Sequence, residues 1–96
     1  MPPYRLDIPP HVGEILRHLP PELKRPVKNA LQALARDPGL GEPLLRELEG
    51  LWKYRVRRFR IVYAIDRGTR ALRIFAVGHR RTIYEEAAAL VRAQDA

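Results

Sequence analysis

Residues 51–84 read LWKYRVRRFRIVYAIDRGTRALRIFAVGHRRTIY, and this stretch decides the fold because it contains three successive runs at β-strand spacing. In the first run, Lys53, Arg55 and Arg57 alternate with apolar or aromatic side chains. Successive side chains of a strand point to opposite faces, so this run predicts one row of charges and one row of core residues. A helix would mix the two rows, and the run is therefore assigned to a strand.

The second and third runs extend this strand into a sheet. Residues 59–65 are apolar on both parities except for Arg60, which is typical of a central strand that carries one functional side chain. Residues 71–77 alternate again, with one row formed by Leu72, Ile74 and Ala76 and the other by Arg73, Phe75 and Val77. Short breaks at residues 57–58 and 66–69 separate the runs, and the second contains the Asp and Gly that turns favour. The stretch therefore predicts a three-stranded antiparallel meander.

The residues before this meander predict a short strand and a helical hairpin. Residues 4–8 alternate and indicate a strand of about five residues. The proline pairs at 9–10 and 20–21 can each open a helix, since the missing N–H costs nothing in the first turn. The apolar stripes at helical spacing are Val12, Ile15, Leu16 and Leu19 in the first helix, and Leu23, Val27, Ala30, Leu31 and Leu34 in the second. Residues 37–39, Asp-Pro-Gly, end the second helix.

Two further signals complete the fold prediction. Pro26 lacks an N–H and clashes with the preceding turn, so the second helix should begin only near Arg25 or have a kinked first turn. After the third strand, Thr82 and Glu85 have the spacing of a capping box and predict a final helix. The predicted class is α+β: an N-terminal strand and a two-helix hairpin pack on an antiparallel sheet whose last three strands form a meander, followed by a short C-terminal helix.

Composition limits the class of protein. The 96 residues, of which 46% are hydrophobic, suit a single domain over residues 1–96 with one core. The lack of cysteine excludes a disulfide framework and a thiolate metal site, and it favours a reducing cytoplasm. No apolar run approaches the ~20 residues that span a bilayer. We expect a cytoplasmic protein with no cofactor and no metal.

The charge is strongly positive and unevenly distributed. The chain has 18 Lys and Arg against 11 Asp and Glu, which gives a net charge of +7. Residues 50–65 contain five cations and no acid. A strand face that was merely solvated would normally mix the two signs, because like charges in adjacent positions repel. This distribution predicts a polyanionic partner, with nucleic acid first and an acidic protein second.

His79 is the histidine best placed for chemistry. It follows the third strand, precedes Arg80 and Arg81, and lies five residues before Tyr84, so a turn there would bring an imidazole and a phenol to the edge of the cationic face. The other two histidines fall at helical positions, where a structural role is favoured over metal ligation. Titratable groups among arginines suit phosphodiester chemistry, in which cations stabilise negative charge while the titratable groups move protons.

Four segments carry a family resemblance. They read LWKYRV from residue 51, FRIVYAI from residue 59, IFAVGHR from residue 74 and IYEEA from residue 83. In these segments the chain resembles the RelE toxins of bacterial toxin–antitoxin operons, within the RelE/ParE superfamily, and the likeness extends over nearly the whole chain. The resemblance implies an mRNA endonuclease that cuts in the ribosomal A site and is held inactive by a co-expressed antitoxin similar to RelB.

The resemblance also implies roles for individual residues. Positions of family catalytic residues match Lys53 and Arg55 in the first meander strand, Arg60 in the second, Arg80 at the end of the third and Tyr84 in the last helix, and His79 takes a place where relatives carry a basic residue or histidine. The neighbouring Arg57, Arg58 and Arg81 are expected to bind RNA. Many relatives have Gly-Asp where this chain has residues 57–58, so its hairpin turn is less permissive and its site more basic.

The expected reaction is attack by the RNA's own 2′-hydroxyl, since the sequence offers neither a carboxylate pair nor a metal-ligand cluster. Arg60 and Arg80 are expected to hold phosphate oxygens, because a guanidinium matches two of them at once. Tyr84 or Lys53 is the expected base and His79 the expected acid at the leaving 5′-oxygen, and these three roles can permute. An acidic antitoxin is expected to cover the two arginines or to displace the last helix.

Two other functions stay open. The scaffold also resembles the ParE toxins, which inhibit DNA gyrase and generally lack the full basic and tyrosine set. A basic module that sequesters RNA or an acidic peptide without reaction would bind with steep salt dependence and leave the RNA intact. The complete set of matched positions favours the endonuclease.

Overall fold

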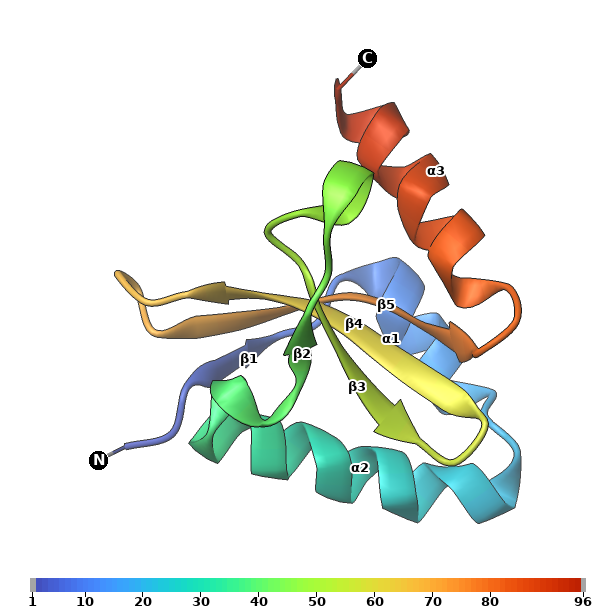
Figure 1. Ribbon diagram of the computed structural model, residues 1–96. Coiled ribbons are helices and arrows are strands. Elements are labelled where there is room, and N and C mark those ends of the chain that lie inside the picture. The colour runs from blue at the N-terminus through green and yellow to red at the C-terminus, as the bar shows by residue number, and fades with distance from the viewer. Residues whose placement is uncertain (1, 96) are drawn as a thin grey trace.

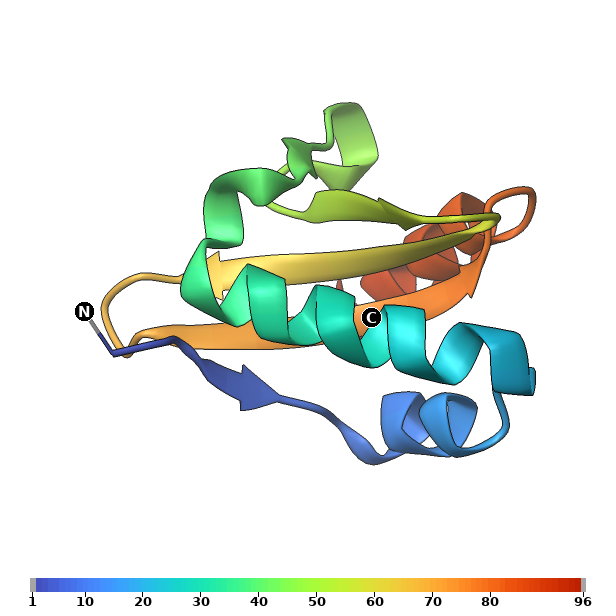
Figure 2. The same cartoon turned by 90° about the horizontal axis from the view of Figure 1, so that it is seen from below.

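The computed structural model describes residues 2–95 and shows a five-stranded sheet with helices on both faces (Figure 1, Figure 2). In chain order the elements are β1 (Arg5–Asp7), α1 (Pro10–Arg17), α2 (Pro21–Arg36), the short 3-10 turn η1 (Pro38–Leu40), β2 (Glu42–Pro43), a second 3-10 turn η2 (Arg46–Leu48), β3 (Trp52–Val56), β4 (Phe59–Asp66), β5 (Ala71–His79) and α3 (Ile83–Asp95). The strand order is β1-β5-β4-β3-β2. The predicted α+β class, with its helical hairpin, meander and C-terminal helix, is confirmed.

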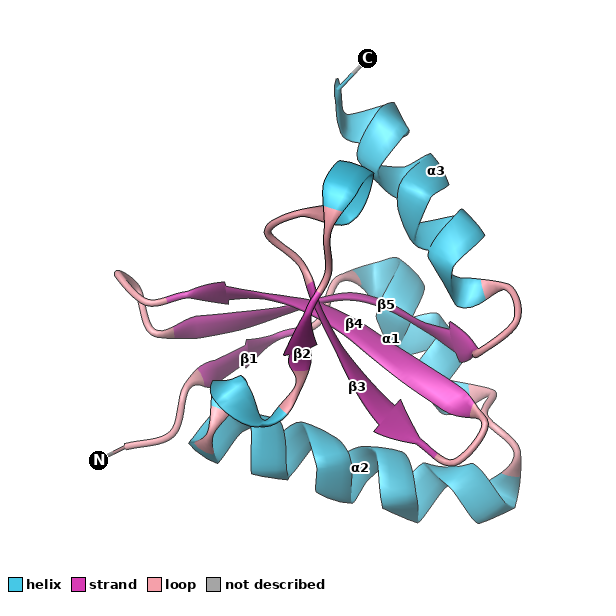
Figure 3. Ribbon diagram, in the orientation of Figure 1, coloured by secondary structure: helices cyan, strands magenta, loops and turns pink. Residues whose placement is uncertain are grey.

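The sheet differs from the prediction at its two edges. The strands β3, β4 and β5 follow one another with tight turns, as expected (Figure 3). At one edge, however, β1 pairs parallel with β5, so the sheet is mixed rather than wholly antiparallel. β1 is also shorter than predicted, because the Tyr4 N–H donates to the Ala35 carbonyl (2.7 Å) instead of to a strand. At the other edge, the two residues Glu42–Pro43 form β2 and pair antiparallel with β3, a strand that the sequence analysis did not predict.

A bulge in β5 changes which side chains share a face. In the pairing of β4 with β5, Val62 lies opposite Ala76 but Tyr63 lies opposite Ile74, so Phe75 is the extra residue. Phe75 and Ala76 consequently both pack on the side of α3, whereas Val77 packs with α1 and α2. The sequence prediction that grouped Ala76 with Ile74 is therefore wrong, because simple alternation does not survive a bulge.

The core has two layers, one on each face of the sheet. The layer beneath α1 and α2 is built from Val12, Leu19, Leu23, Val27, Ala30, Leu31, Leu34, Val56, Ile61, Tyr63, Leu72, Ile74 and Val77. The layer between the sheet, η2 and α3 is smaller and contains Leu48, Leu51, Val62, Phe75, Ala76, Ile83, Ala87 and Ala88. Only the first part of α3 is buried, and the rest of this helix extends away from the sheet (Figure 1). Within residues 2–95, no helix is long and apolar enough to cross a membrane.

The proline inside α2 is accommodated by the β3–β4 turn. The helix begins at Pro21 and continues past Pro26, so of the two predicted alternatives the start near Arg25 is wrong. Because Pro26 has no N–H, the Glu22 carbonyl lacks its usual helical partner. The Arg57 guanidinium donates to this carbonyl instead (3.0 Å). The backbone of Arg57 has φ of +56°, the left-handed conformation that glycine adopts more easily.

Candidate functional site

A row of cations crosses the sheet on the face that carries α3. Arg55 pairs directly with Arg60, and Arg60 pairs with Gly78 on the next strand. A Cβ built on Gly78 would lie 3.0 Å from Ile83 Cδ1 and 3.2 Å from Glu86 Oε2, so this row faces the start of α3. Glycine leaves space beside Arg60 where any other residue would fill the face.

The two arginines of this row repel each other unless an anion lies between them. Arg55 is exposed and Arg60 half-buried, and cross-strand like charges directly opposite each other are destabilising. One terminal nitrogen of Arg60 donates to the carbonyls of Arg57 (3.1 Å) and Phe59 (2.9 Å), which bends the side chain towards the β3–β4 turn. The other donors of this guanidinium remain available for a ligand. Such an arrangement suits a phosphate group.

Lys53 and Tyr84 meet on the same face. Lys53 lies two residues before Arg55 on β3 and is half-buried, and Tyr84 lies in the first turn of α3. The Lys53 Nζ is 5.8 Å from the centre of the Tyr84 ring, which is within the range of a cation–π contact. The structure thus brings together four of the predicted site residues: Lys53, Arg55, Arg60 and Tyr84.

His79 lies on the opposite face of the sheet. It pairs with Phe59, and the two rings are 6.0 Å apart in an edge-to-face arrangement. Phe59 packs against the core beneath α1 and α2, and a hollow of about 340 Å³ between the α1–α2 loop and the β3–β4 turn is lined by both rings. The Nδ1 atom of His79 accepts a hydrogen bond from the Arg81 N–H (3.2 Å), so a neutral ring carries its proton on Nε2. His79 lies on this face because the bulge at Phe75 shifts the alternation of β5 by one residue.

The bulge itself is held by α1. Within residues 2–95, β1 pairs with residues 71–73 of β5 and no strand lies beside the rest of that edge. There the Nε2 atom of His11 lies 3.1 Å from the Phe75 carbonyl and satisfies it. The sequence indicated a structural role for this histidine, but the partner on β5 could be found only from the fold.

The remaining predicted cations surround the β3–β4 turn. The Arg80 N–H donates to the Arg58 carbonyl (2.7 Å), which ties the loop before α3 to this turn. Arg58, Arg80 and Arg81 are all exposed. Arg57 is also exposed, but its guanidinium reaches the Glu22 carbonyl on α2 and thus lies apart from the Lys53–Tyr84 pair. The Arg57 guanidinium therefore lies at the rim of the site, and the backbone of Arg80 is held beside the β3–β4 turn next to Arg60.

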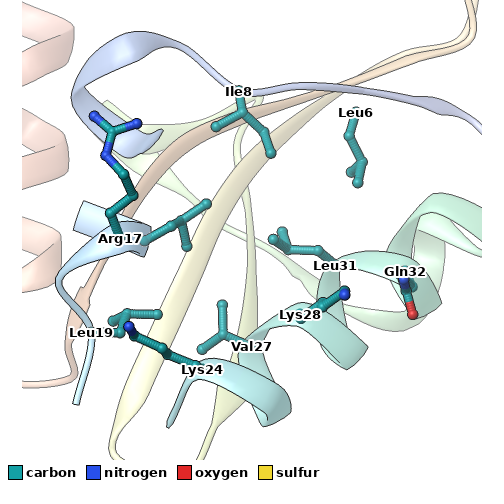
Figure 4. Close-up of a pocket in the computed structure, with 10 residues that line it drawn as sticks. Leu6, Ile8, Arg17, Leu19, Lys24, Val27, Lys28, Leu31 and Gln32 are labelled. Atoms are coloured by element: carbon teal, nitrogen blue, oxygen red, sulfur yellow. The ribbon is translucent and has the colours of Figure 1, made fainter. Parts of the chain in front are cut away.

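A second surface was missed in the sequence. A groove of about 510 Å³ lies between β1, α1 and α2, and its apolar floor is formed by Leu6, Ile8, Leu16, Leu19, Val27 and Leu31. Figure 4 shows Arg17, Lys24 and Lys28 around these apolar side chains. Arg17 forms an ion pair with Glu14, whereas no ion pair of the described residues involves either lysine. In the sequence, Lys24 and Lys28 look like ordinary solvated cations. Their apolar neighbours come partly from β1 and α1, so the groove is visible only in the folded chain.

Comparison with known proteins identifies the family. The profile described as ParE toxin of type II toxin-antitoxin system, parDE, matches residues 5–84. Toxin RelG of Mycobacterium tuberculosis is 36% identical over 84 residues, which cover 85% of this chain and 97% of RelG. The chain belongs to the RelE/ParE family of type II toxins.

Solved structures of relatives agree with this assignment of the toxin. A chain of the toxin–antitoxin complex RelBE2 from M. tuberculosis has a TM-score of 0.75 and 33% identity, with 83% of this toxin and 94% of that chain covered. A mutant of the Escherichia coli toxin RelE in the free state also gives a TM-score of 0.75, over 96% of this toxin and 97% of that chain. At 19% identity, the second likeness concerns the fold alone.

Proposed function

We propose that this toxin is an mRNA endonuclease that acts in the A site of the translating ribosome and so inhibits translation in the cytoplasm. The observation that carries the proposal is the convergence of Lys53, Arg55, Arg60 and Tyr84 on one sheet face. In the described residues, no ion pair joins an acid to any of these cations. The cations are therefore free to bind phosphate, and the phenol and the amine are free to move protons.

The chemistry needs only the RNA and these side chains. The 2′-hydroxyl loses its proton to a base and attacks the adjacent phosphorus, and the bond to the 5′-oxygen breaks as that oxygen takes up a proton. The products are a 2′,3′-cyclic phosphate and a 5′-hydroxyl. Arg60 and Arg80 are proposed to hold the non-bridging oxygens, where charge builds up.

The geometry supports a narrower assignment of proton transfer than the sequence did. Lys53 and Tyr84 are in contact, and we assign the base and the acid to this pair. His79 lies on the other face with its Nδ1 occupied, so we assign it to the rim, where it orients the loop that carries Arg80 and Arg81. Arg57 and Arg58 would bind the RNA strand beyond the cleaved bond.

Inhibition of DNA gyrase is the second candidate, and it is favoured by one observation: the matching family profile is named for ParE. Expression of the toxin in a growing culture separates the two functions. We expect growth to stop with messages cut within codons, as mapped by primer extension, while plasmid supercoiling stays normal. Arrest with intact mRNA and loss of supercoiling would establish the gyrase inhibitor, and arrest with neither change would favour a binding module.

The proposed partner is an acidic antitoxin. Relatives of known structure include toxin–antitoxin complexes, and this toxin has a net charge of +7. The groove beside α2 supports an amphipathic helix with acidic side chains as the docked segment. Its floor is apolar, with Ile8 38% exposed, and Lys24 and Lys28 stand one turn apart on its rim. Acids one turn apart on the partner would face them.

Charge reversal tests this docking surface. The double variant Lys24→Glu/Lys28→Glu should bind the protein encoded beside the toxin on the order of 30-fold more weakly, because attraction at two rim positions becomes repulsion. RNA cleavage should be unchanged. The matched control is Arg25→Glu/Arg67→Glu, which makes the same change in charge at exposed positions outside the groove. Equal affinity of both variants would place the antitoxin elsewhere.

A further inference from the structure

The hydroxyl of Tyr63 holds the chain segment next to β3. Tyr63 is fully buried, and its hydroxyl donates to the Pro38 carbonyl (2.7 Å) and accepts from the Gly41 N–H (3.2 Å). Burial raises the pKa of Tyr63 to about 12, against the opposing effect of the Gly41 hydrogen bond. The hydroxyl is thus protonated at neutral pH and available as a donor. Both bonds go to the loop of residues 38–41, which is far from Tyr63 in the sequence.

Gly41 sits where no other residue fits. A Cβ at this position would collide with the Tyr63 hydroxyl and with the Lys53 carbonyl. The backbone φ of Gly41 is −81°, which any residue can adopt, so the requirement is for space and not for conformational freedom. The hydrogen atoms of the Gly41 α-carbon therefore leave the only space between the phenolic oxygen of Tyr63 and the carbonyl of Lys53, and a methyl group would not fit there.

Lys53 is the residue that this arrangement fixes. It pairs with Val62 of β4 on one side and with Glu42 of β2 on the other. β2 has only two residues, so few hydrogen bonds of its own hold it in place. Tyr63 supplies the missing support through Gly41, the residue directly before β2.

We infer that Tyr63 is a positioning residue that sets Lys53 against Tyr84 through the Gly41 contact. This inference rests on the proposed RNA cleavage. Sequence patterning marks Tyr63 only as a buried aromatic residue, whose ring also stacks on Trp52 at 6.3 Å. The ring of Tyr63 fills the core, and its hydroxyl holds Gly41 beside Lys53. A shift of about 1 Å in a reacting group can cost 100-fold in rate, so a small movement of Lys53 is sufficient to be measured.

The test removes the hydroxyl and keeps the ring. Tyr63→Phe should lower kcat for cleavage of ribosome-bound mRNA at least tenfold and leave KM within about twofold, because the phosphate-binding arginines do not move. Assays run well below the melting temperature of the variant, which circular dichroism measures. Tyr4→Phe is the matched control, since it removes a hydroxyl from another ring that packs against the same core, away from the site.

Gly41→Ala provides an independent variant. Its added methyl group would collide with the Tyr63 hydroxyl and with the Lys53 carbonyl, so it displaces the same segment from Lys53 while Tyr63 itself is not substituted. It should therefore reproduce the loss in kcat at unchanged KM. Wild-type kcat in a folded Tyr63→Phe protein with a lowered melting temperature would overturn the inference and leave only a structural role. A wild-type toxin that cuts no RNA would overturn the proposed function and this inference together.

Discussion

When this toxin is added to ribosomes programmed with a message whose A-site codon carries 2′-deoxyribose, the message is expected to remain uncut. The reason is chemical: the attacking group in the proposed reaction is the 2′-hydroxyl itself. The side chains at the site orient this hydroxyl, move protons and stabilise the charge on the phosphate, but none of them replaces the attacking group. The expected loss is complete within the sensitivity of a gel assay. A message with 2′-deoxyribose at the preceding codon is the control, and it should be cut at the normal rate.

The ends of the normal products test the same chemistry. Mass spectrometry should find a 2′,3′-cyclic phosphate on the upstream fragment and a 5′-hydroxyl on the downstream fragment, and cleavage should persist in EDTA. A 5′-phosphate on the downstream fragment, or cleavage of the deoxy codon, would refute attack by the 2′-hydroxyl.

Replacement of Lys53 by alanine is expected to slow cleavage about 100- to 10,000-fold, the range for loss of a general acid or base. Lys53 is half-buried at the centre of the site, and its Nζ is in contact with the Tyr84 ring. Single-turnover kinetics on programmed ribosomes measure the chemical step directly. Tyr84→Phe should give a loss of similar size if the phenol is the second proton carrier, with ribosome binding little changed.

The control for this prediction is Arg67→Ala, which removes an exposed cation in the β4–β5 turn. Because general attraction to the ribosome depends on total charge, this control corrects for the loss of one cation. A Lys53→Ala toxin that cuts as fast as Arg67→Ala would show that Lys53 only contributes charge. The proton transfers would then have to be reassigned, with His79 as the next candidate.

The local structure could be derived from the sequence because short-range signals fix it. Proline pairs start α1 and α2, the Asp-Pro-Gly segment ends α2, and the alternation of residues 52–56 marks β3. The Asp66–Thr69 turn is another such case, since the Thr69 N–H donates to the Asp66 carboxylate (3.1 Å) and thereby lowers the pKa of Asp66. Each of these signals acts within a few residues, so it can be recognised in the sequence without knowledge of the fold.

The candidate site was predicted in part for the same reason. Strand parity set Lys53 and Arg55 on one face, and family resemblance added Arg60 and Tyr84, which the fold brings to that face. Lys53 and Tyr84 are 31 positions apart in the chain, and no local rule sets the distance between them. Only the packing of α3 on the same face of the sheet as Lys53 brings the two side chains together.

The tertiary structure alone decided the features that depend on contacts between distant segments. The bulge at Phe75, whose carbonyl His11 satisfies from α1, reverses the alternation of β5 and so moves His79 away from Lys53 and Tyr84. The support of Gly41 by Tyr63 likewise joins a loop to a strand 22 residues later. The sequence by itself determined the helices, the strands and the rows of charge, because periodicity is a local property. Which side chains of β5 share a face with Lys53 and Tyr84 was set by the extra residue Phe75. The sequence pattern of β5 does not reveal that His11 of α1 will bind the Phe75 carbonyl.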